Sequence, residues 1–348
     1  MTSQKEQSRY HWAVLGCGVI ANELASALLE TGQTLYGVTN RTYSKAVDFQ
    51  KKYNVTHIYH TFDQMIEDET VDIIYITTPH NTHISYIQKA LQHDKHVLCE
   101  KSVTLNSEEL TEAMELAKEK NLIFAEAMTI YHMPLYKKLD KIVNGGQLGA
   151  VQLITMNFGS FKEYDMKNRF FNRDLAGGAM LDIGVYALSF IRFFFKSQPD
   201  QILSQVKFAP TGVDEQATIL LMNRENQMAT VALSLHSKQP KRAMISCEKG
   251  YVEVMEYPRG VKAVITDAVS GEKEMIEMKE EKPALAYEVA DMEAAVSMLY
   301  SMSQHKLTDI EKKKEEIEAL TRLEYSRDVM EIMTKIRREW GMVYPEEE

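Results

Sequence analysis

The sequence has 348 residues and a formal net charge of −10 at pH 7, from 40 basic and 50 acidic side chains. This acidic balance argues against partners such as nucleic acid or an anionic membrane, because both attract basic proteins. A hydrophobic fraction of 45% and a charged fraction of 26% are typical of a soluble globular protein, and the length favours two domains over one.

The three cysteines, Cys17, Cys99 and Cys247, have no metal-ligand spacing, so we expect no metal site. Cys17 and Cys99 lie inside apparent strand–helix units, so we expect them to be buried thiols in a reducing cytosol. The N-terminal residues are polar and lack the apolar core of a signal peptide. No stretch is expected to reach the ~20 apolar residues of a membrane span. The sequence therefore predicts a cytoplasmic protein.

The chain begins with a candidate dinucleotide-binding turn. Residues 12–15 are typical of a short buried parallel strand, Gly16 and Gly18 follow, and an amphipathic helix begins behind them. Gly16 permits a tight turn, and Gly18 permits the backbone to approach a pyrophosphate at the helix N-terminus. Ala21 permits close packing of helix on strand. The alternative is a plain strand–helix turn without a ligand.

The end of the second predicted strand, residues 34–39, bears on the choice of cofactor. A fold that prefers NAD usually places an acid here for the ribose 2′-hydroxyl. Asn40 and Arg41 stand there instead, and Thr42, Ser44 and Lys45 follow. A 2′-phosphate would meet these groups, so NADP is favoured and NAD remains possible. The alternative is that Arg41 is an ordinary surface cation.

Three further predicted strands, residues 71–77, 96–99 and 122–126, alternate with helices and complete a doubly wound half. Ligands of such sheets bind outside the carboxyl ends of the strands. Thr78, Pro79, Asn81 and His83 follow one strand, and Glu100 and Lys101 follow the next. The predicted cofactor contacts are Gly16, Gly18, Val19, Ile20, Asn40, Arg41, Thr78, Pro79, Asn81, His83, Glu100 and Lys101. His83 has an alternative role as a helix-cap histidine.

Beyond about residue 130 the pattern changes to a predicted α+β domain. A strand at 151–159 precedes a polar loop, and a helix is predicted over 177–195. Mostly antiparallel strands follow, and two long helices are predicted over 285–302 and 309–340. The predicted domains are 1–130, which binds dinucleotide, and 131–348, with terminal helices able to pack back on the first. In the loop, Arg169 and Arg173 could bind a phosphate or carboxylate, or could pair with Asp165 and Asp174; the ion pairs are favoured.

Within the predicted helix over 177–195, Asp182 and Tyr186 are four residues apart and would share a face. Gly184 lies inside this helix, where glycine costs ~1 kcal/mol relative to alanine. Such a glycine suggests that something approaches the helix closely. The alternative is an amphipathic helix that tolerates a glycine.

Four motifs together resemble the glucose–fructose oxidoreductase, inositol dehydrogenase and MocA (Gfo/Idh/MocA) family. They are Gly16-x-Gly18-x-x-Ala21, Pro79-x-x-x-His83, Glu100-Lys101, and the Gly-Gly-x-x-Leu-Asp-x-Gly-x-Tyr run from Gly177 to Tyr186. Within that family the chain looks most similar to the dihydrodiol and xylose dehydrogenase branch, in which tyrosine replaces the usual histidine at the Tyr186 position.

The resemblance implies a Rossmann domain followed by an α+β domain with a large open sheet, an assembly into homodimers or dimers of dimers, and hydride transfer. The expected substrate is a secondary carbinol or carbonyl of a sugar, polyol, diol or dicarbonyl. Lys101, Tyr186 and Asp182 are the expected catalytic residues. A phenol of pKa ≈ 10 is a poor base at neutral pH, and a nearby ammonium favours its phenolate. Asp182 would orient the substrate or the lysine, or is a simple helix acid.

Three positions depart from the family pattern: Ser102 replaces a proline, Ala176 replaces a glycine, and Ser189 stands where histidine-type members often carry an aspartate. None removes a catalytic atom. Two alternatives stay open. One is a non-catalytic dinucleotide-binding sensor, and the other is an NAD-dependent cyclitol or aldose dehydrogenase.

Overall fold

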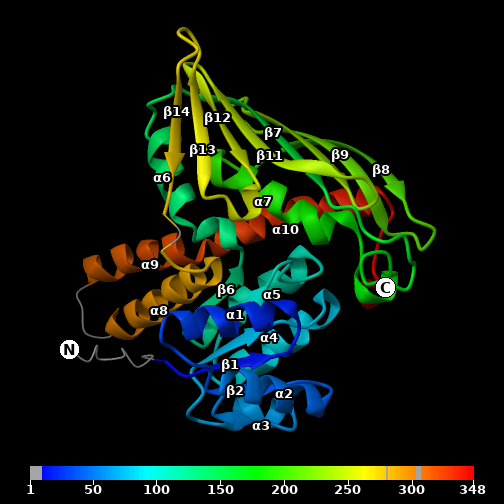
Figure 1. The fold of residues 1–348 in the computed structure, drawn as a ribbon, viewed down its shortest axis with the longest axis vertical. Coiled ribbons are helices and arrows are strands. Elements are labelled where there is room, and N and C mark those ends of the chain that lie inside the picture. Colours follow the sequence, from blue (N-terminus) through cyan, green and yellow to red (C-terminus); the bar gives the residue numbers. More distant parts are fainter. Residues whose placement is uncertain (1–9, 280, 303–306) are drawn as a thin grey trace. The chain divides into compact units, whose positions relative to one another are not determined.

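The computed structural model describes residues 10–279, 281–302 and 307–348, which divide into two compact units (Figure 1). Unit 1 contains residues 10–103, 108–127, 281–302 and 307–323, and unit 2 contains 104–107, 128–279 and 324–348. The chain therefore passes between the units several times. Each unit has its own sheet.

Unit 1 is built on six parallel strands in the order β3-β2-β1-β4-β5-β6. This is the strand order of a doubly wound dinucleotide-binding sheet, so the predicted Rossmann fold is confirmed. Its central strands are fully buried apolar runs because helices cover both faces of such a sheet. The strands are β1 (Trp12–Leu15), β2 (Gly37–Thr39), β3 (His57–Ile58), β4 (Ile73–Ile76), β5 (His96–Glu100) and β6 (Phe124–Ala127).

The connecting helices of unit 1 are joined by two helices from late in the chain. α8 (Ala284–Met302) shares the core of α1 through apolar residues such as Leu285, Val289 and Met292. Trp12 Nε1 also donates to Glu293 Oε1 at 2.9 Å, and so ties β1 to α8. The other helices of unit 1 are α1 (Val19–Glu30), α2 (Tyr43–Tyr53), α3 (Phe62–Glu67), α4 (His83–Gln92), α5 (Ser107–Glu119), whose first residue belongs to unit 2, and α9 (Leu307–Thr321).

Unit 2 contains an eight-stranded sheet in the order β14-β13-β12-β11-β7-β10-β9-β8. Only β7 and β10 pair in parallel, so the sheet is mostly antiparallel, as predicted. The alternation of buried and exposed residues along β9 shows that one face is packed and the other is open. The strands are β7 (Val151–Gly159), β8 (Gln201–Phe208), β9 (Asp214–Met222), β10 (Met228–Ser234), β11 (Gln239–Cys247), β12 (Gly250–Met255), β13 (Lys262–Asp267) and β14 (Lys273–Glu277).

The helices of unit 2 differ from the prediction in two places. The expected regular helix over 177–195 is a π-helical turn, η4 (Met180–Gly184), continued by α7 (Val185–Phe194). The expected helix over 309–340 is broken at Arg322, whose φ of 50° is left-handed, so that α9 ends before it and α10 (Leu323–Glu339) follows. The remaining long helix of unit 2 is α6 (Pro134–Val143), and short helical turns are η2 (Thr129–Tyr131), η3 (Arg173–Leu175), η5 (Tyr257–Arg259) and η6 (Pro345–Glu347).

One segment, Arg173–Phe194, is long and apolar enough to span a membrane, contrary to the expectation from sequence. Its most apolar stretch of 18 residues has a mean hydropathy of 1.4, and 83% of that stretch is buried. That burial is the behaviour of a helix in the core of a globular domain.

Candidate active site

The glycine turn after β1 has the backbone that a dinucleotide site needs. Gly16 has a φ of 107°, and a Cβ there would lie 2.6 Å from Thr77 Oγ1. Only glycine fits both the angle and the contact. A Cβ on Gly18 would meet nothing within 4 Å, so the Gly18 backbone faces open space. This is the position at which a pyrophosphate can approach.

The N-terminus of α1 follows this open turn. Within the described part of the chain, the first N–H of this region to find a backbone acceptor is that of Asn22, which donates to Gly18 O at 3.1 Å. The earlier amides of Val19 and Ile20 belong to the helix end that leaves N–H groups available to an anion, and no acid lies in this first turn. Val19 is 75% exposed, and Ile20 packs partly against the core.

Asn22 is a residue that the sequence analysis missed. Its Nδ2 donates to Gly18 O at 2.8 Å and to Cys17 O at 3.2 Å. Its Oδ1 accepts from Tyr53 Oη at 2.8 Å and Lys52 Nζ at 3.0 Å. Asn22 thus links the glycine turn to α2. No spacing rule marks it, because both α2 partners are about thirty residues away in sequence.

The end of β2 is polar and basic, as predicted. Asn40 Nδ2 donates to Thr42 O at 3.0 Å and shapes the turn into α2. Arg41 is exposed, and no ion pair joins it to any residue that the structure describes. Lys45 lies close enough to Cys17 for its charge to oppose the effect of burial, which raises the pKa of that thiol to about 11. The Lys45 ammonium therefore lies near the glycine turn, and exposed Arg41 follows the strand that pairs with β1.

The loop after β4 contains Thr78, Pro79, Asn81 and His83. Pro79 is exposed, and Thr82 Oγ1 donates to Pro79 O at 2.7 Å, which fixes the turn. His83 is fully buried, with Nε2 2.8 Å from Thr78 O and Nδ1 3.0 Å from Ser102 O. Burial lowers the pKa of its imidazole. His83 therefore connects the loop after β4 to the loop after β5. Both of its ring nitrogens face backbone carbonyls, and neither faces a position where a cofactor would bind.

Lys101 follows β5 at the same carboxyl edge of the sheet. Its carbonyl lies 3.2 Å from His80 Nε2, and the Lys101–Ser102 peptide bond is cis. Ser102, which stands in place of the family proline, is fully buried, and its carbonyl faces His83. The next amide, Val103 N, donates to Glu126 Oε1 at 3.1 Å. Hydrogen bonds to buried side chains thus hold the backbone around Lys101.

Glu100 faces inward from β5. Its Oε1 accepts from the hydroxyl of Tyr75, which is fully buried in β4. Burial and the Glu100 charge raise the pKa of Tyr75 well above its usual range. Glu100 therefore cross-links β4 and β5 below Lys101.

In unit 2, Asp182 lies in η4 and Tyr186 in α7. Asp182 is 9% exposed, and Oδ1 lies 3.6 Å from Arg169 Nη2. The Tyr186 ring is half-buried and lies 6.2 Å from that of Phe158 at the end of β7. The π-turn that contains Asp182 changes the α-helical spacing assumed between Asp182 and Tyr186, and such turns are frequent at functional sites.

The glycines around Asp182 make close contacts within the protein. A Cβ on Gly184 would lie 2.9 Å from Leu233 Cδ1, so the close approach suggested by this glycine is to β10. Gly178 has a φ of 124°, and a Cβ there would lie 2.1 Å from Asp214 Oδ1. Asp214 is fully buried at the start of β9, and its Oδ2 accepts from Met180 N at 2.6 Å. Asp214 therefore caps the Asp182 segment, a role that sequence analysis missed.

The two loop arginines form ion pairs, the interpretation that the sequence favoured, and the partners Asp182 and Glu348 lie outside the loop. Arg169 pairs with Asp182, and its guanidinium lies 4.3 Å from the centroid of the Phe170 ring. Arg173 pairs with Glu348 at 2.5 Å and donates from Nε to Val343 O at 2.9 Å. The pairs with Asp182 and Glu348 were not predicted, because sequence proximity does not show which other segment a loop folds against. No metal-binding cluster of His, Cys, Asp and Glu occurs among the residues described.

Two family models match the chain. Residues 10–128 match the oxidoreductase family with an NAD-binding Rossmann fold, and residues 136–253 match the GFO/IDH/MocA C-terminal domain. Curated relatives include trans-1,2-dihydrobenzene-1,2-diol dehydrogenases. The Xenopus tropicalis protein is 26% identical over 247 residues, 70% of this chain and 74% of that relative. The Homo sapiens protein is 28% identical over 248 residues, with the same coverage.

Solved structures share the fold at lower identity. A 3-ketoreductase from Actinomadura kijaniata in complex with NADP and TDP-benzene has a TM-score of 0.75 and 18% identity, covering 90% of this chain and 96% of that one. A UDP-N-acetylglucosamine 3-dehydrogenase from Acidithiobacillus ferrooxidans has a TM-score of 0.75 and 19% identity, covering 94% and 96%.

Proposed function

The chain belongs to the Gfo/Idh/MocA family of NAD(P)-binding oxidoreductases, and from this premise we propose that it is a dehydrogenase or reductase acting on a secondary carbinol and its ketone. The observation that carries the proposal is the position of Lys101. It follows β5 at the sheet edge where the Gly18 turn opens, so an ammonium lies at the edge where ligands of such sheets bind.

The proposed cofactor is NADP. The open Gly18 backbone and the first-turn amides of α1 suit a pyrophosphate, and exposed Arg41 suits a 2′-phosphate. No acid stands at the end of β2 to favour the 2′-hydroxyl of NAD. The related 3-ketoreductase structure contains NADP, which supports the same choice. When bound, the nicotinamide supplies the hydride acceptor or donor.

The chain's own residues handle the proton and the oxygen. In the oxidation direction, the Tyr186 phenolic oxygen takes the proton of the carbinol hydroxyl, and the Lys101 ammonium donates a hydrogen bond to the same substrate oxygen. In this proposal the Lys101 ammonium would also favour the phenolate form of Tyr186, because a positive charge stabilises a phenolate close to it. Asp182 orients the substrate. The Arg169 guanidinium beside it balances the negative charge of the Asp182 carboxylate.

The favoured substrates are diols, sugars and dicarbonyls, in line with the dihydrodiol dehydrogenases among the relatives. A second candidate is a nucleotide-linked sugar. The Phe161 ring is 64% exposed and stacks on His236 with ring centroids 5.6 Å apart. It lies three residues after Phe158, whose ring is next to that of Tyr186. Exposed aromatic rings of this kind can stack on a nucleobase. A screen of free and nucleotide-linked sugars with both cofactors decides between the two classes.

Tyr186→Phe tests the proposed chemistry. It removes only the phenolic hydroxyl, so we expect turnover to fall by roughly two to four orders of magnitude, the range of a positioned general acid–base. NADPH binding, measured by fluorescence quenching, is expected to stay unchanged. The matched control is Tyr251→Phe in β12, which should leave turnover unchanged. Undiminished turnover in Tyr186→Phe removes the tyrosine from the mechanism.

The competing class is a dinucleotide-binding sensor without turnover. It predicts NADPH binding by the wild-type protein but no oxidation of NADPH by any carbonyl in the screen. Lys101→Met distinguishes the enzyme from the sensor further. Turnover should fall if the protein is an enzyme, whereas a sensor has no turnover for the substitution to reduce. An NAD-dependent cyclitol or aldose dehydrogenase would instead bind NADH more tightly than NADPH. Location in the cytoplasm remains part of the proposal.

A further inference from the structure

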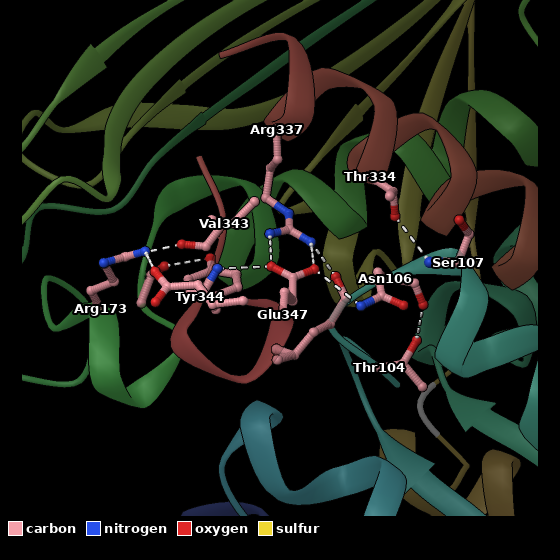
Figure 2. A network of polar contacts seen from close by, with 12 residues as sticks. Thr104, Asn106, Ser107, Arg173, Thr334, Arg337, Val343, Tyr344 and Glu347 are labelled. Atoms are coloured by element: carbon pink, nitrogen blue, oxygen red, sulfur yellow. Dashed lines mark hydrogen bonds and ion pairs between the residues drawn. The ribbon is translucent and has the colours of Figure 1, made fainter. Parts of the chain in front are cut away.

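We propose that Arg337, Tyr344 and Glu347, here called the C-terminal clamp, form a positioning device for the active site (Figure 2). The clamp holds the Gly177 carbonyl that precedes the Asp182 segment and the residues 104–107 that follow Lys101 in the chain. The inference rests on the proposed roles of Lys101, Asp182 and Tyr186.

The centre of the clamp is a buried ion pair. Arg337, on α10, is 1% exposed. Its Nη1 donates to Glu347 Oε2 at 2.8 Å and its Nη2 to Glu347 Oε1 at 2.9 Å, a bidentate arrangement. The guanidinium also lies 4.7 Å from the centroid of the Tyr344 ring. Because both charges are removed from water, loss of one partner leaves the other uncompensated.

One arm of the clamp reaches residues 104–107. Arg337 Nη2 donates to Leu105 O, and Asn106 Nδ2 donates to Glu347 Oε1 at 3.1 Å. On the same helix as Arg337, Thr334 Oγ1 accepts from Ser107 N at 3.0 Å. These bonds fix a stretch that begins only three residues after Lys101.

The other arm reaches the glycine pair before Asp182. Tyr344 Oη donates to Gly177 O at 2.6 Å, and Tyr344 N donates to Glu347 Oε2 at 2.8 Å. Gly177 has no room for a side chain, since a Cβ would lie 2.6 Å from Arg169 O. The backbone at Gly177 is therefore held from both sides, five residues before Asp182.

The two arms share the carboxylate of Glu347, so both segments depend on one group. Neither arm touches a reacting atom, which makes these residues positioning residues. A small misplacement of a catalytic group is enough to slow a reaction by roughly 100-fold. The clamp should therefore affect turnover far more than cofactor binding, which belongs to the glycine turn and Arg41.

Tyr344→Phe is the sharpest test, because it deletes only the hydroxyl that binds Gly177 O. Glu347→Gln is the second variant, since it keeps the shape of the side chain and removes its charge. We expect both to lower kcat by roughly 10- to 100-fold with NADPH binding unchanged. Tyr251→Phe serves as the control. Hydrogen–deuterium exchange is expected to accelerate in residues 177–182 in Tyr344→Phe, and in both 104–107 and 177–182 in Glu347→Gln.

The exchange measurement also separates failure of the clamp from failure of the proposed function. If the wild-type protein turns over no carbinol, exchange alone decides whether the clamp holds the two segments. Unchanged exchange in both variants overturns the inference whatever the activity. Faster exchange with unchanged kcat in an active enzyme overturns it too, because the clamp would then stabilise the fold without positioning the site.

Discussion

At the scale of single residues, Asp214 is a fully buried residue with an ionisable carboxyl group. Burial raises the pKa of its carboxyl from 3.8 to about 7, although the Met180 amide and the Arg337 guanidinium act in the opposite direction. The groups that face it from other elements are Arg337 on α10 and the Tyr344 hydroxyl. Asp214 therefore changes charge near neutral pH while capping the Asp182 segment.

The pH dependence of stability follows from that raised pKa. Below pH 3.8 the carboxyl is protonated in both the folded and unfolded states. Between pH 3.8 and about 7 the unfolded chain loses the proton first, so the free energy of unfolding falls as pH rises, and above about 7 the loss is constant. Asp214→Asn should remove this fall. Urea unfolding of wild type and variant across this range measures the difference.

A useful control for that experiment has the opposite sign. Asp267 is exposed, and amide hydrogen bonds from Ser270 and Val269 lower its pKa. Its stabilising effect is present above the unfolded pKa and is lost as pH falls through the folded one. Asp267→Asn should therefore reduce stability at neutral pH and not in acid. A wild-type slope unchanged by Asp214→Asn would show that the Asp214 carboxyl does not titrate near neutral pH.

Arg41 is the residue on which the choice between NADP and NAD depends. Arg41→Ala should weaken NADPH binding roughly 10- to 100-fold, the loss of a charge-assisted hydrogen bond of ~1.5–3 kcal/mol, and leave NADH binding unchanged. Fluorescence titration with both cofactors measures this, and Arg224→Ala, an exposed arginine in unit 2, is the control. Equal losses for both cofactors would show that the guanidinium does not read the 2′-phosphate.

At the scale of elements, the buried strands and the doubly wound fold of unit 1 followed from the sequence, whereas the π-helical turn that contains Asp182 did not. Apolar runs such as residues 12–15 and 73–76 are local signals, and glycines mark the first turn. The π-turn over Met180–Gly184 depends instead on Asp214, which is over thirty residues away, and on Leu233 packed against Gly184. The break at Arg322 likewise has no glycine or proline to mark it. Contacts distant in sequence set these features.

The glycine pair before Asp182 gives a test at this scale. Gly178→Ala should destabilise the protein by more than the ~1–3 kcal/mol of a strained left-handed residue, because its Cβ would also lie 2.1 Å from Asp214 Oδ1. Gly212→Ala is a matched control, since Gly212 has a φ of 85° and a Cβ there would meet nothing within 4 Å. Denaturant midpoints compare them. Equal losses would mean that Asp214 does not pack against Gly178.

At the scale of the whole molecule, the late helices show why a division by sequence is incomplete. Composition suggests one boundary near residue 130 and terminal helices able to pack back on the first domain, without saying which ones. In the structure α8 and α9 belong to unit 1, and α10 belongs to unit 2 after its first residue. The apolar face of α8 finds its partner in α1, and nothing in its periodicity identifies that partner. The catalytic assignments likewise rest on the family motifs, since Lys101 is in unit 1 and Tyr186 is in unit 2.

We propose that a second subunit packs on the open face of the unit 2 sheet, in the homodimer or dimer of dimers that the family resemblance implies. Strand register places Leu203, Leu220 and Met275 in one row across that face, through Thr230, Thr155, Met244, Glu253 and Val264. Leu203 is 69% exposed, Leu220 43% and Met275 64%. Leu203 and Leu220 are direct neighbours at one end of the sheet, and Met275 lies on the edge strand at the other end. Exposed large apolar side chains on one face are typical of a surface that another subunit covers.

Leu220→Asp tests this assembly. A carboxylate placed beside Leu203 in a covered contact loses its water without gaining a partner, so we expect the variant to be monomeric where the wild type is dimeric. Size-exclusion chromatography with light scattering at micromolar concentration measures the mass. Val269→Asp is the control, because Val269 is 96% exposed in the turn between β13 and β14 and lies outside the row. A wild-type monomer at that concentration, or a Leu220→Asp protein that remains dimeric, would place any dimer contact on another surface.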